Sequence, residues 1–298
     1  MVSIPAALAD ATSHREGNAG VRWLNELPSL IDRFLHEWAC EVVGEAWHGE
    51  AAIVLPVQRD ADVAVLKFSF PHPGNRGEAP ALRHLGGRGA VRLLDADEEA
   101  FALLLERAGQ ETLASLPSAD EAIEAAGHLA RRLAVPAPAG MQSLAEVTAA
   151  WEQELDQQIA AVPDRLPSRV IARARETIRM LTNDATPTML HGDLHFGNVL
   201  SAYREPWLTI DPKGWRGTAA FDAFTVIAGR RDELHHADDL ERAIRGRVHR
   251  YAMAAGVDTD VALACCQARA TSSYLYQHLQ EGDWFDRDFL RCAVAITE

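Results

Sequence analysis

The sequence lacks the features of a membrane protein or a secreted protein. No apolar run approaches the roughly 18 residues that a membrane span needs. The first residues, MVSIPAALADATSHREG, contain no basic stretch ahead of an apolar one, which is the order that a signal peptide would show. We therefore expect a cytoplasmic protein without a membrane partner.

Cysteines are few, and their spacing suits neither a metal site nor a disulfide framework. The thiols belong to Cys40, Cys265, Cys266 and Cys292, and none of them stands in a C-x-x-C pair. Cys265 and Cys266 are adjacent in a helical stretch, so their side chains would point in different directions. We interpret all of them as buried or unreactive thiols.

Basic charge is also scarce. Lys and Arg number 29 against 43 Asp and Glu residues, which leaves a formal net charge of -14. Because phosphate backbones select basic surfaces, this balance argues against a nucleic-acid partner and suits a cationic small molecule better. The chain also lacks the G-x4-G-K-[ST] phosphate loop, so we interpret Gly86, Gly87 and Gly89 as structural glycines.

The pattern of apolar residues along the chain predicts an α+β fold. After a helix-like opening that includes LPSLIDRFLHEWA, the runs AAIVLPV and VAVLKFSF predict a β-hairpin, and AVRLLDAD and FALLLERA predict a second strand pair. A short helix is expected over 78–85. From Ser118 onward the pattern is typical of long amphipathic helices, interrupted by two short strands at NVLSA and WLTIDP. The chain therefore divides into a β-rich part, 1–106, and a helical part, 107–298, with a hinge near LLLERAGQ.

One segment of the helical part, TMLHGDLHFGNVL, carries a chemical motif. It places Asp193 and Asn198 in a loop just ahead of a strand, and Asp211 ends the next strand. The spacing of five residues and then thirteen is typical of kinase-type phosphotransferases. Such chemistry needs a carboxylate that orients the acceptor hydroxyl and takes its proton, which predicts Asp193 as the catalytic base. Mg²⁺ prefers hard oxygen ligands, which predicts Asn198 and Asp211 as its ligands.

Each of these residues also has a structural interpretation. Asp193 could cap backbone amides of a tight loop, and Asn198 could cap the turn before the strand. Asp211 could pair with Lys213, two residues further along. Asp222, beside a phenylalanine at a helix start, is interpreted as a structural anchor of the catalytic loop.

The histidines of the segment allow a different metal chemistry. A metal-dependent hydrolase would use His191, Asp193 and His195 as zinc or iron ligands, but it would leave Lys67 and Asn198 unexplained. We expect His191 to hold the loop by hydrogen bonds, and the function of His195 stays open.

A kinase-type site also needs a lysine on a strand of the β-rich part. Alternation along VAVLKFSF points Lys67 to the same face as Val65 and Ser69, and a charge on an otherwise apolar strand needs a reason. Glu78 is the carboxylate available from the following helix, which predicts a Lys67–Glu78 ion pair. Pro80 suits only the first turn of a helix, so Glu78 would lie at the helix start.

These motifs together resemble the aminoglycoside O-phosphotransferases. The segments HGDLHFGNVL, REPWLTIDPKG and GAVRLLDADEEAFALLLERA are similar to the branch that contains streptomycin 6-kinases and hydroxyurea phosphotransferases. The resemblance implies a two-lobed protein-kinase-like fold with a small β-rich N-lobe for the nucleotide and a larger helical C-lobe for catalysis and acceptor binding. It implies ATP as donor, Mg²⁺ as cofactor, and Lys67 and Glu78 as nucleotide-site residues. The adenine would lie at the hinge backbone near Glu106 and Ala108.

The resemblance also implies the class of acceptor. We expect a streptomycin-type aminoglycoside, which is cationic, with hydroxyurea or another small hydroxylated compound as the alternative. A catalytically silent nucleotide-binding module is a further alternative, although none of the key groups is replaced. We expect a monomer or a weak dimer.

Two regions bear on acceptor specificity. Where relatives of this branch usually have Gly-Asp-Pro before the Phe-Asp pair, this chain reads RGTAAFD, so the segment after Asp211 is expected to differ in shape. Acidic residues of the helical lobe tend to hold the acceptor's cationic groups in this family, and Trp284 could stack on a ring or fill the core. The acidic candidates are Asp232, Glu233, Asp283 and Asp286.

Overall fold

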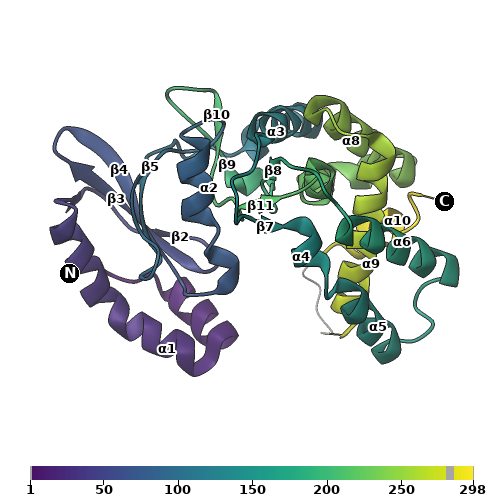
Figure 1. Ribbon diagram of the computed structural model, residues 1–298, viewed down its shortest axis with the longest axis horizontal. Helices are drawn as coiled ribbons and strands as arrows, with labels where there is room; N and C mark the ends of the chain where they lie inside the picture. Colours follow the sequence, from purple (N-terminus) through teal and green to yellow (C-terminus); the bar gives the residue numbers. More distant parts are fainter. Residues whose placement is uncertain (1, 280–284, 298) are drawn as a thin grey trace. The chain divides into compact units, whose positions relative to one another are not determined.

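The computed structural model describes residues 2–279 and 285–297 and divides the chain into two compact units, Met1–Gly109 and Gln110–Glu298. Unit 1 is built around an antiparallel sheet, and unit 2 is mostly helical (Figure 1). The predicted α+β class is therefore confirmed. The functional division into lobes 1–106 and 107–298 remains a prediction. Asp283 and Trp284 lie outside the described residues.

Unit 1 contains one sheet, and its two longest strands form the hairpin that the sequence predicts. The strand order is β1-β3-β4-β6-β5, and β2 also pairs with β3. The hairpin strands pair from Ala52 opposite Ser69 to Arg59 opposite Asp62, and the second predicted strand pair is β5 with β6. The strands are β1 (Glu41–Val42), β2 (Trp47–His48), β3 (Ala52–Arg59), β4 (Asp62–Ser69), β5 (Leu93–Asp97) and β6 (Ala102–Glu106).

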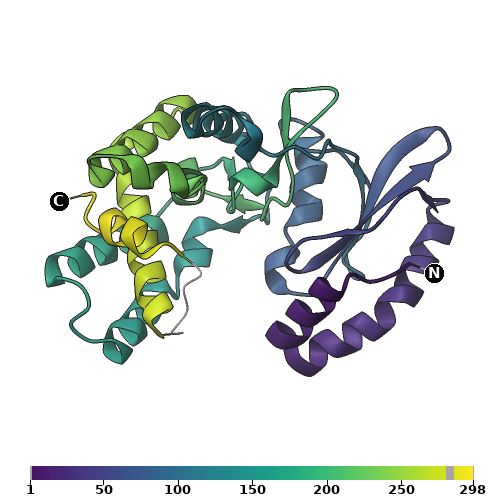
Figure 2. The same ribbon diagram turned by 180° about the vertical axis from the view of Figure 1, so that it is seen from behind.

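The two faces of this sheet have different partners. Leu66 and Phe68 of β4 belong to an apolar core shared with helix α1 (Ala6–Glu37), which runs along the sheet (Figures 1 and 2). Lys67 and Ser69 alternate with them and therefore point to the opposite face. The sheet thus presents the charged side chain of Lys67 to the face that α1 does not cover.

Helix α2 (Glu78–Leu85) occupies the range predicted for it. Pro80 lies in the first turn, where its missing N–H removes no helical hydrogen bond. Gly86 ends the helix in a left-handed conformation with φ of 57°, and its N–H donates to the carbonyl oxygen of Leu82. Both ends of the helix are therefore determined by local sequence, which places Glu78 at its first position.

Unit 2 is an assembly of helices around one large apolar core. Helices α3 and α8 pack side by side (Figures 1 and 2). None of the helices in the described residues combines the length and the apolar character that crossing a bilayer requires. The helices are α3 (Ala119–Leu133), α4 (Leu144–Thr148), α5 (Trp151–Ala161), α6 (Ser168–Thr182), α7 (Ala223–Ile227), α8 (Leu240–Ala255), α9 (Thr259–Leu279) and α10 (Arg287–Ala293).

Short strands in unit 2 hold the segments of the chemical motif together. The predicted pair is present as the hairpin β9 (Val199–Ser201) and β10 (Trp207–Thr209). A second small sheet of β7 (Gln142–Ser143), β11 (Trp215–Arg216) and β8 (Met189–Leu190) was not predicted, because two-residue strands have no detectable periodicity. Since β8 precedes His191 and β11 follows Asp211, this sheet joins the two ends of the motif.

The close contact of α3 with α8 makes a prediction about two glycines. A methyl group on Gly127 of α3 would lie 2.6 Å from the Cβ of Ala254 and 2.9 Å from the carbonyl oxygen of Tyr251, whereas one on Gly246 of α8 would meet nothing within 4 Å. We expect Gly127→Ala to lower the free energy of unfolding by about 1–3 kcal/mol through overpacking. Gly246→Ala should raise it by about 1 kcal/mol through helix propensity.

Urea unfolding of both variants beside the wild type measures this difference. Because both changes replace a helical glycine by alanine, propensity alone would shift the two variants in the same direction. A Gly127→Ala protein as stable as Gly246→Ala would therefore contradict the predicted close packing.

Candidate functional site

The loop that carries Asp193 is anchored by one buried carboxylate. Asp222 ends the 3-10 helix η4 (Ala219–Asp222) and accepts hydrogen bonds from the backbone amides of His191, at 3.0 Å, and Gly192, at 2.9 Å. Burial raises the pKa of Asp222 to about 7, although the nearby Arg269 guanidinium and the two amides act in the opposite direction. Asp222 is the structural anchor that the sequence predicts.

Gly192 is required at its position for two reasons. Its φ of +87° lies in a region that residues with a side chain rarely adopt. A methyl group there would also lie 2.8 Å from the Trp215 ring and 2.9 Å from the Cβ of Lys213. The loop can therefore approach the segment after Asp211 only because this residue has no side chain.

His191 holds the same loop from inside through hydrogen bonds of both ring nitrogens. Its side chain is fully buried. The carbonyl oxygen of Ile210 can only accept, so the Nε2–H of His191 donates to it at 2.9 Å, and Nδ1 accepts the amide of Asp193 at 3.3 Å. Burial lowers the pKa of His191 to about 4, so the ring is neutral near pH 7. With both ring nitrogens engaged, His191 does not suit the hydrolase alternative.

His195 has a local function. Its Nδ1 accepts the amide of Gly197 at 3.1 Å, which caps the N-terminus of the 3-10 helix η3 (Phe196–Asn198). His195 therefore shapes the loop that ends at Asn198.

The strand hairpin brings Asn198 and Asp211 to the loop of Asp193. The amide nitrogen of the Asn198 side chain donates to the carbonyl oxygen of Asp193 at 2.9 Å. The backbone amide of Ile210 donates to the carbonyl oxygen of Asn198, also at 2.9 Å. The side chains of Asp193 and Asp211 are 35% and 30% exposed. Both carboxylates are therefore accessible to a ligand.

The donor set of these residues fits Mg²⁺. Asn198 uses its amide nitrogen within the loop, which leaves its amide oxygen as a potential ligand beside the Asp211 carboxylate. Mg²⁺ is usually bound through one or two carboxylates and completed by waters and substrate phosphates. In the described part of the chain, no three His, Cys, Asp or Glu side chains form a cluster that could hold a metal alone. A metal held jointly with a nucleotide is the arrangement that these ligands suit.

Lys213 lies between the two carboxylates. Its Nζ is 3.4 Å from Oδ2 of Asp211 and 3.9 Å from Oδ2 of Asp193. The pairing with Asp211 is the structural alternative that the sequence raised, and it is present. The approach to Asp193 was not predicted, because it depends on how the loop folds back onto the chain after β10.

Unit 1 contains the predicted buried ion pair. The Lys67 ammonium lies 2.7 Å and 2.8 Å from the two carboxylate oxygens of Glu78, and these residues are 9% and 2% exposed. Lys67 stands on β4 between β3 and β6, and Glu78 is the first residue of α2, where the helix dipole favours a negative charge. The pair exists as expected, whereas its function toward a nucleotide remains a proposal.

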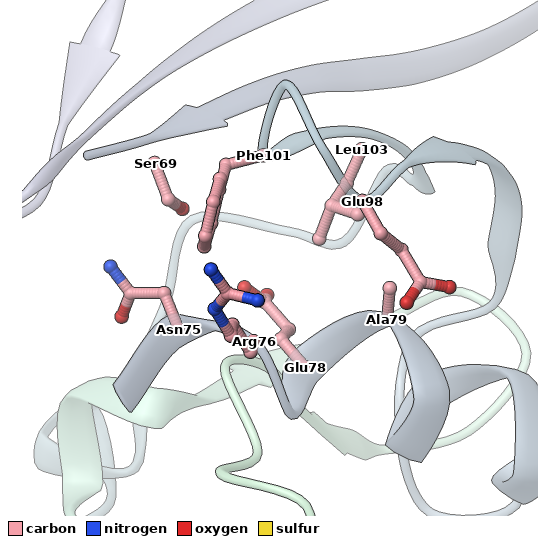
Figure 3. A pocket seen from close by; sticks show the side chains of 8 residues that line it. All are labelled: Ser69, Asn75, Arg76, Glu78, Ala79, Glu98, Phe101 and Leu103. Atoms are coloured by element: carbon pink, nitrogen blue, oxygen red, sulfur yellow. The ribbon is translucent and has the colours of Figure 1, made fainter. Parts of the chain in front are cut away.

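A small pocket adjoins this ion pair. Figure 3 shows Ser69 and Phe101 on the sheet side and Arg76 and Glu78 at the start of α2, with the Arg76 guanidinium 5.9 Å from the Phe101 ring centroid. Its volume of about 20 Å³ has room for a water or two and is far too small for a nucleotide. The lining residues are Ser69, Asn75, Arg76, Glu78, Ala79, Glu98, Phe101 and Leu103.

The two residues predicted beside the adenine lie at the end of β6. Glu106 is its last residue, and both its backbone and its side chain are engaged with Arg92, whose amide donates to the Glu106 carboxylate at 2.9 Å. Ala108 follows in an irregular segment. Contact of an adenine with the backbone near Glu106 and Ala108 stays a prediction.

Two of the acidic candidates for acceptor binding have other uses in the fold. Glu233 pairs with Arg230 and accepts the amide of Ala119 at the start of α3. Asp286 caps α10 by accepting the amide of Phe289. Asp232 is exposed. Glu233 and Asp286 therefore contribute to the fold, whether or not they also meet an acceptor.

The buried ion pair of unit 1 predicts a large cost of removing one partner. In Lys67→Met, the Glu78 carboxylate would stay buried without its cation, so we expect the free energy of unfolding to fall by about 3–5 kcal/mol. Arg83 and Glu98 form an exposed pair in the same unit, and Arg83→Met should cost less than about 1 kcal/mol. Urea unfolding of both variants measures the contrast, and equal stabilities would contradict it.

The buried His191 predicts a pH dependence of stability. Its pKa is about 4 in the folded chain against an ordinary value of 6.5, so the unfolded chain binds more protons between these values. The contribution of this group to the free energy of unfolding should therefore decrease as the pH falls from 6.5 to 4, by up to about 1.4 kcal/mol per pH unit, while the raised pKa of Asp222 acts in the opposite direction. Urea unfolding at several pH values, with EDTA present, should show that His191→Gln loses this contribution, so that its stability falls less, or rises more, than that of the wild type over this range.

His128 provides the control for this measurement, because its side chain is 60% exposed. His128→Gln should keep the slope of the wild type. The same slope in wild type and His191→Gln would contradict the assignment of a buried neutral ring.

Known proteins similar to this chain share one activity class. Residues 37–278 match the family model described as aminoglycoside/hydroxyurea antibiotic resistance kinase. The chain is 37% identical to a streptomycin 6-kinase of Streptomyces glaucescens over 87% of this chain and 85% of that protein. It is also 37% identical to a hydroxyurea phosphotransferase of Kitasatospora aureofaciens, over 83% of this chain and 74% of that protein.

A solved structure shares the fold at low sequence identity. It is a spectinomycin phosphotransferase in complex with ADP and spectinomycin, with a TM-score of 0.52, 11% identity, and coverage of 90% of this chain and 98% of that one. The predicted protein-kinase-like fold is confirmed by this likeness. This chain therefore belongs to the aminoglycoside/hydroxyurea antibiotic resistance kinase family, and it is a small-molecule kinase.

Proposed function

We propose that this kinase transfers the γ-phosphate of ATP to a hydroxyl group of a streptomycin-type aminoglycoside with the help of Mg²⁺. The observation that carries the proposal is the constellation of Asp193, Asn198 and Asp211, which a buried anchor and a strand hairpin hold together. Base and metal ligands at one place are what in-line phosphoryl transfer requires of a protein.

In this proposal Asp193 is the catalytic base. Its carboxylate, 35% exposed, orients the acceptor hydroxyl and accepts its proton as the hydroxyl oxygen bonds to the γ-phosphorus. The bond between that phosphorus and the bridging oxygen breaks, and ADP leaves with the bonding electrons. Mg²⁺, when bound by Asn198 and Asp211 with the phosphates, would neutralise the charge that develops there.

Lys67 and Glu78 of unit 1 would serve the nucleotide. The carboxylate of Glu78 fixes the Lys67 ammonium through two short contacts, and an ammonium held in this way can bind the α- and β-phosphates. The backbone near Glu106 and Ala108 would receive the adenine. The ADP in the structure of similar fold supports ATP as donor.

The nature of the acceptor rests on the relatives and on charge. One similar protein is a streptomycin 6-kinase and another a hydroxyurea phosphotransferase, at equal identity. The net charge of -14 favours the cationic aminoglycoside, because an acidic protein attracts cations. Hydroxyurea stays the second candidate. We also propose a cytoplasmic location, with no nucleic-acid or membrane partner and a monomer or weak dimer as the working form.

An ADP-release assay tests the proposed function. With Mg²⁺ and ATP, the wild type should release ADP in the presence of streptomycin and much less with no acceptor. Asp193→Asn should lower the acceptor-dependent rate by about 10²- to 10⁴-fold, because it removes the base and keeps the shape. Its affinity for ADP, measured by calorimetry, should stay close to that of the wild type.

Other acceptors complete the experiment. Release that depends on hydroxyurea and not on streptomycin would assign the second candidate. An Asp193→Asn variant with the full rate would refute the assignment of Asp193 as the base, whatever the acceptor.

A further inference from the structure

Lys213 is a cation at the site for which the proposed reaction gives no function. Of the 29 Lys and Arg residues, only Lys67 and Lys213 are lysines. Arginine supplies the cation in most of the other ion pairs of the described residues, and its planar fork suits carboxylates. Lysine supplies a compact point charge instead, which suits a phosphate group as in phosphate-binding loops. Lys67 already stands at the proposed phosphate position of unit 1, so Lys213 is the lysine that remains to be explained.

The backbone fixes where the Lys213 side chain begins. Its amide donates to the carbonyl oxygen of His191 at 2.8 Å, and its Cβ lies so close to Gly192 that a methyl group there would be 2.9 Å away. Asp211, with φ of 58°, and the buried Pro212 turn the chain into this position. Lys213 is therefore tied to the same loop as the base Asp193.

The side-chain contacts of Lys213 are longer than those of a strong ion pair. Its Nζ lies 3.4 Å from Asp211 and 3.9 Å from Asp193, whereas a strong charge-assisted hydrogen bond would be about 2.7–2.9 Å long. The side chain is only 19% exposed. The ammonium thus makes one long hydrogen bond, to Asp211, and its other hydrogens are available to a third anionic group.

The reaction itself would supply that group. The transferred phosphoryl passes between the hydroxyl oriented by Asp193 and the nucleotide that shares its metal with Asp211, and negative charge spreads over its oxygens. The Nδ1 atom of the neighbouring His195 is engaged with the amide of Gly197. Lys213 is the basic side chain of the described residues at ion-pair distance from Asp193.

We propose that Lys213 is a catalytic residue whose ammonium contacts the γ-phosphoryl group of ATP and stabilises it during transfer. This inference rests on the proposed phosphotransferase function. The proton of the acceptor hydroxyl goes to Asp193, the new oxygen–phosphorus bond forms, and the bond to ADP breaks. The ammonium donates hydrogen bonds to the phosphoryl oxygens and takes no part in the proton transfer.

Nucleotide binding tests this contact without turnover. ADP lacks the γ-phosphate and its analogue AMP-PNP retains it, so calorimetry with each nucleotide and Mg²⁺ isolates the interaction. In Lys213→Met, which keeps the length of the side chain and removes its charge, we expect AMP-PNP to bind about tenfold more weakly, the loss of one charge-assisted hydrogen bond. ADP should bind as it does to the wild type.

Kinetics test the catalytic part. At saturating Mg²⁺, kcat of Lys213→Met should fall by about 10²- to 10³-fold, and Lys213→Arg, which keeps the charge, should retain more activity than Lys213→Met. The control is Arg132→Met, which removes an exposed cation of the same unit that pairs with Glu205, and it should change neither kcat nor nucleotide affinity. Thermal melting of every variant measures its fold.

Several outcomes would overturn the inference. They are a Lys213→Met enzyme with wild-type kcat at saturating Mg²⁺, and equal changes in the affinities for ADP and AMP-PNP. A Lys213→Met rate that is low only at subsaturating Mg²⁺ would also overturn it, because Lys213 would then only substitute for the charge of the metal. A wild type that releases no ADP with any acceptor would count against the proposed function instead, and the comparison of ADP with AMP-PNP would still decide whether Lys213 contacts the γ-phosphate.

Discussion

The conformation of the loop that carries Asp193 depends on the hydrogen bonds that Asp222 accepts from the amides of His191 and Gly192. A tight loop buries backbone donors, and each donor left without a partner would cost about 1–3 kcal/mol. One carboxylate satisfies two of them, while Arg269, which donates to the carbonyl oxygen of Phe221, lowers the cost of burying its charge. With the loop anchored in this way, Asp193 faces outward and its neighbours face the core.

The charged groups of the two units differ in burial, and each degree of burial suits a different function. Lys67 and Glu78 are buried and joined by two short contacts, which keeps an ammonium in one place. Asp193 and Asp211 are partly exposed, and the loop that carries Asp193 is held through its backbone by Asp222. A fixed cation is suited to positioning a nucleotide, whereas carboxylates that remain accessible can receive a hydroxyl or a metal.

Much of this arrangement could be predicted from the sequence, because its signals are local. The hairpin β3–β4 follows from alternation, α2 from its first-turn proline and its terminal glycine, and the motif residues from spacing. The small sheet β7–β11–β8 could not be predicted, because strands of two residues have no period. The second contact of Lys213, with Asp193, was missed because it joins residues that only the folded loop brings together.

The sequence alone determined the class of fold, the order of its elements and the residues that could perform phosphoryl transfer, because periodicity, capping and motif spacing act over a few residues. Only the tertiary structure decided how each group is used. It showed that His191 is neutral and holds the loop by hydrogen bonds, and that His195 caps a 3-10 helix. Glu233 and Asp286 form hydrogen bonds within the fold, and Lys213 lies beside the base. Burial and hydrogen-bond partners determine whether a side chain is charged and whether it can contact a ligand. Both are set only when distant segments pack together.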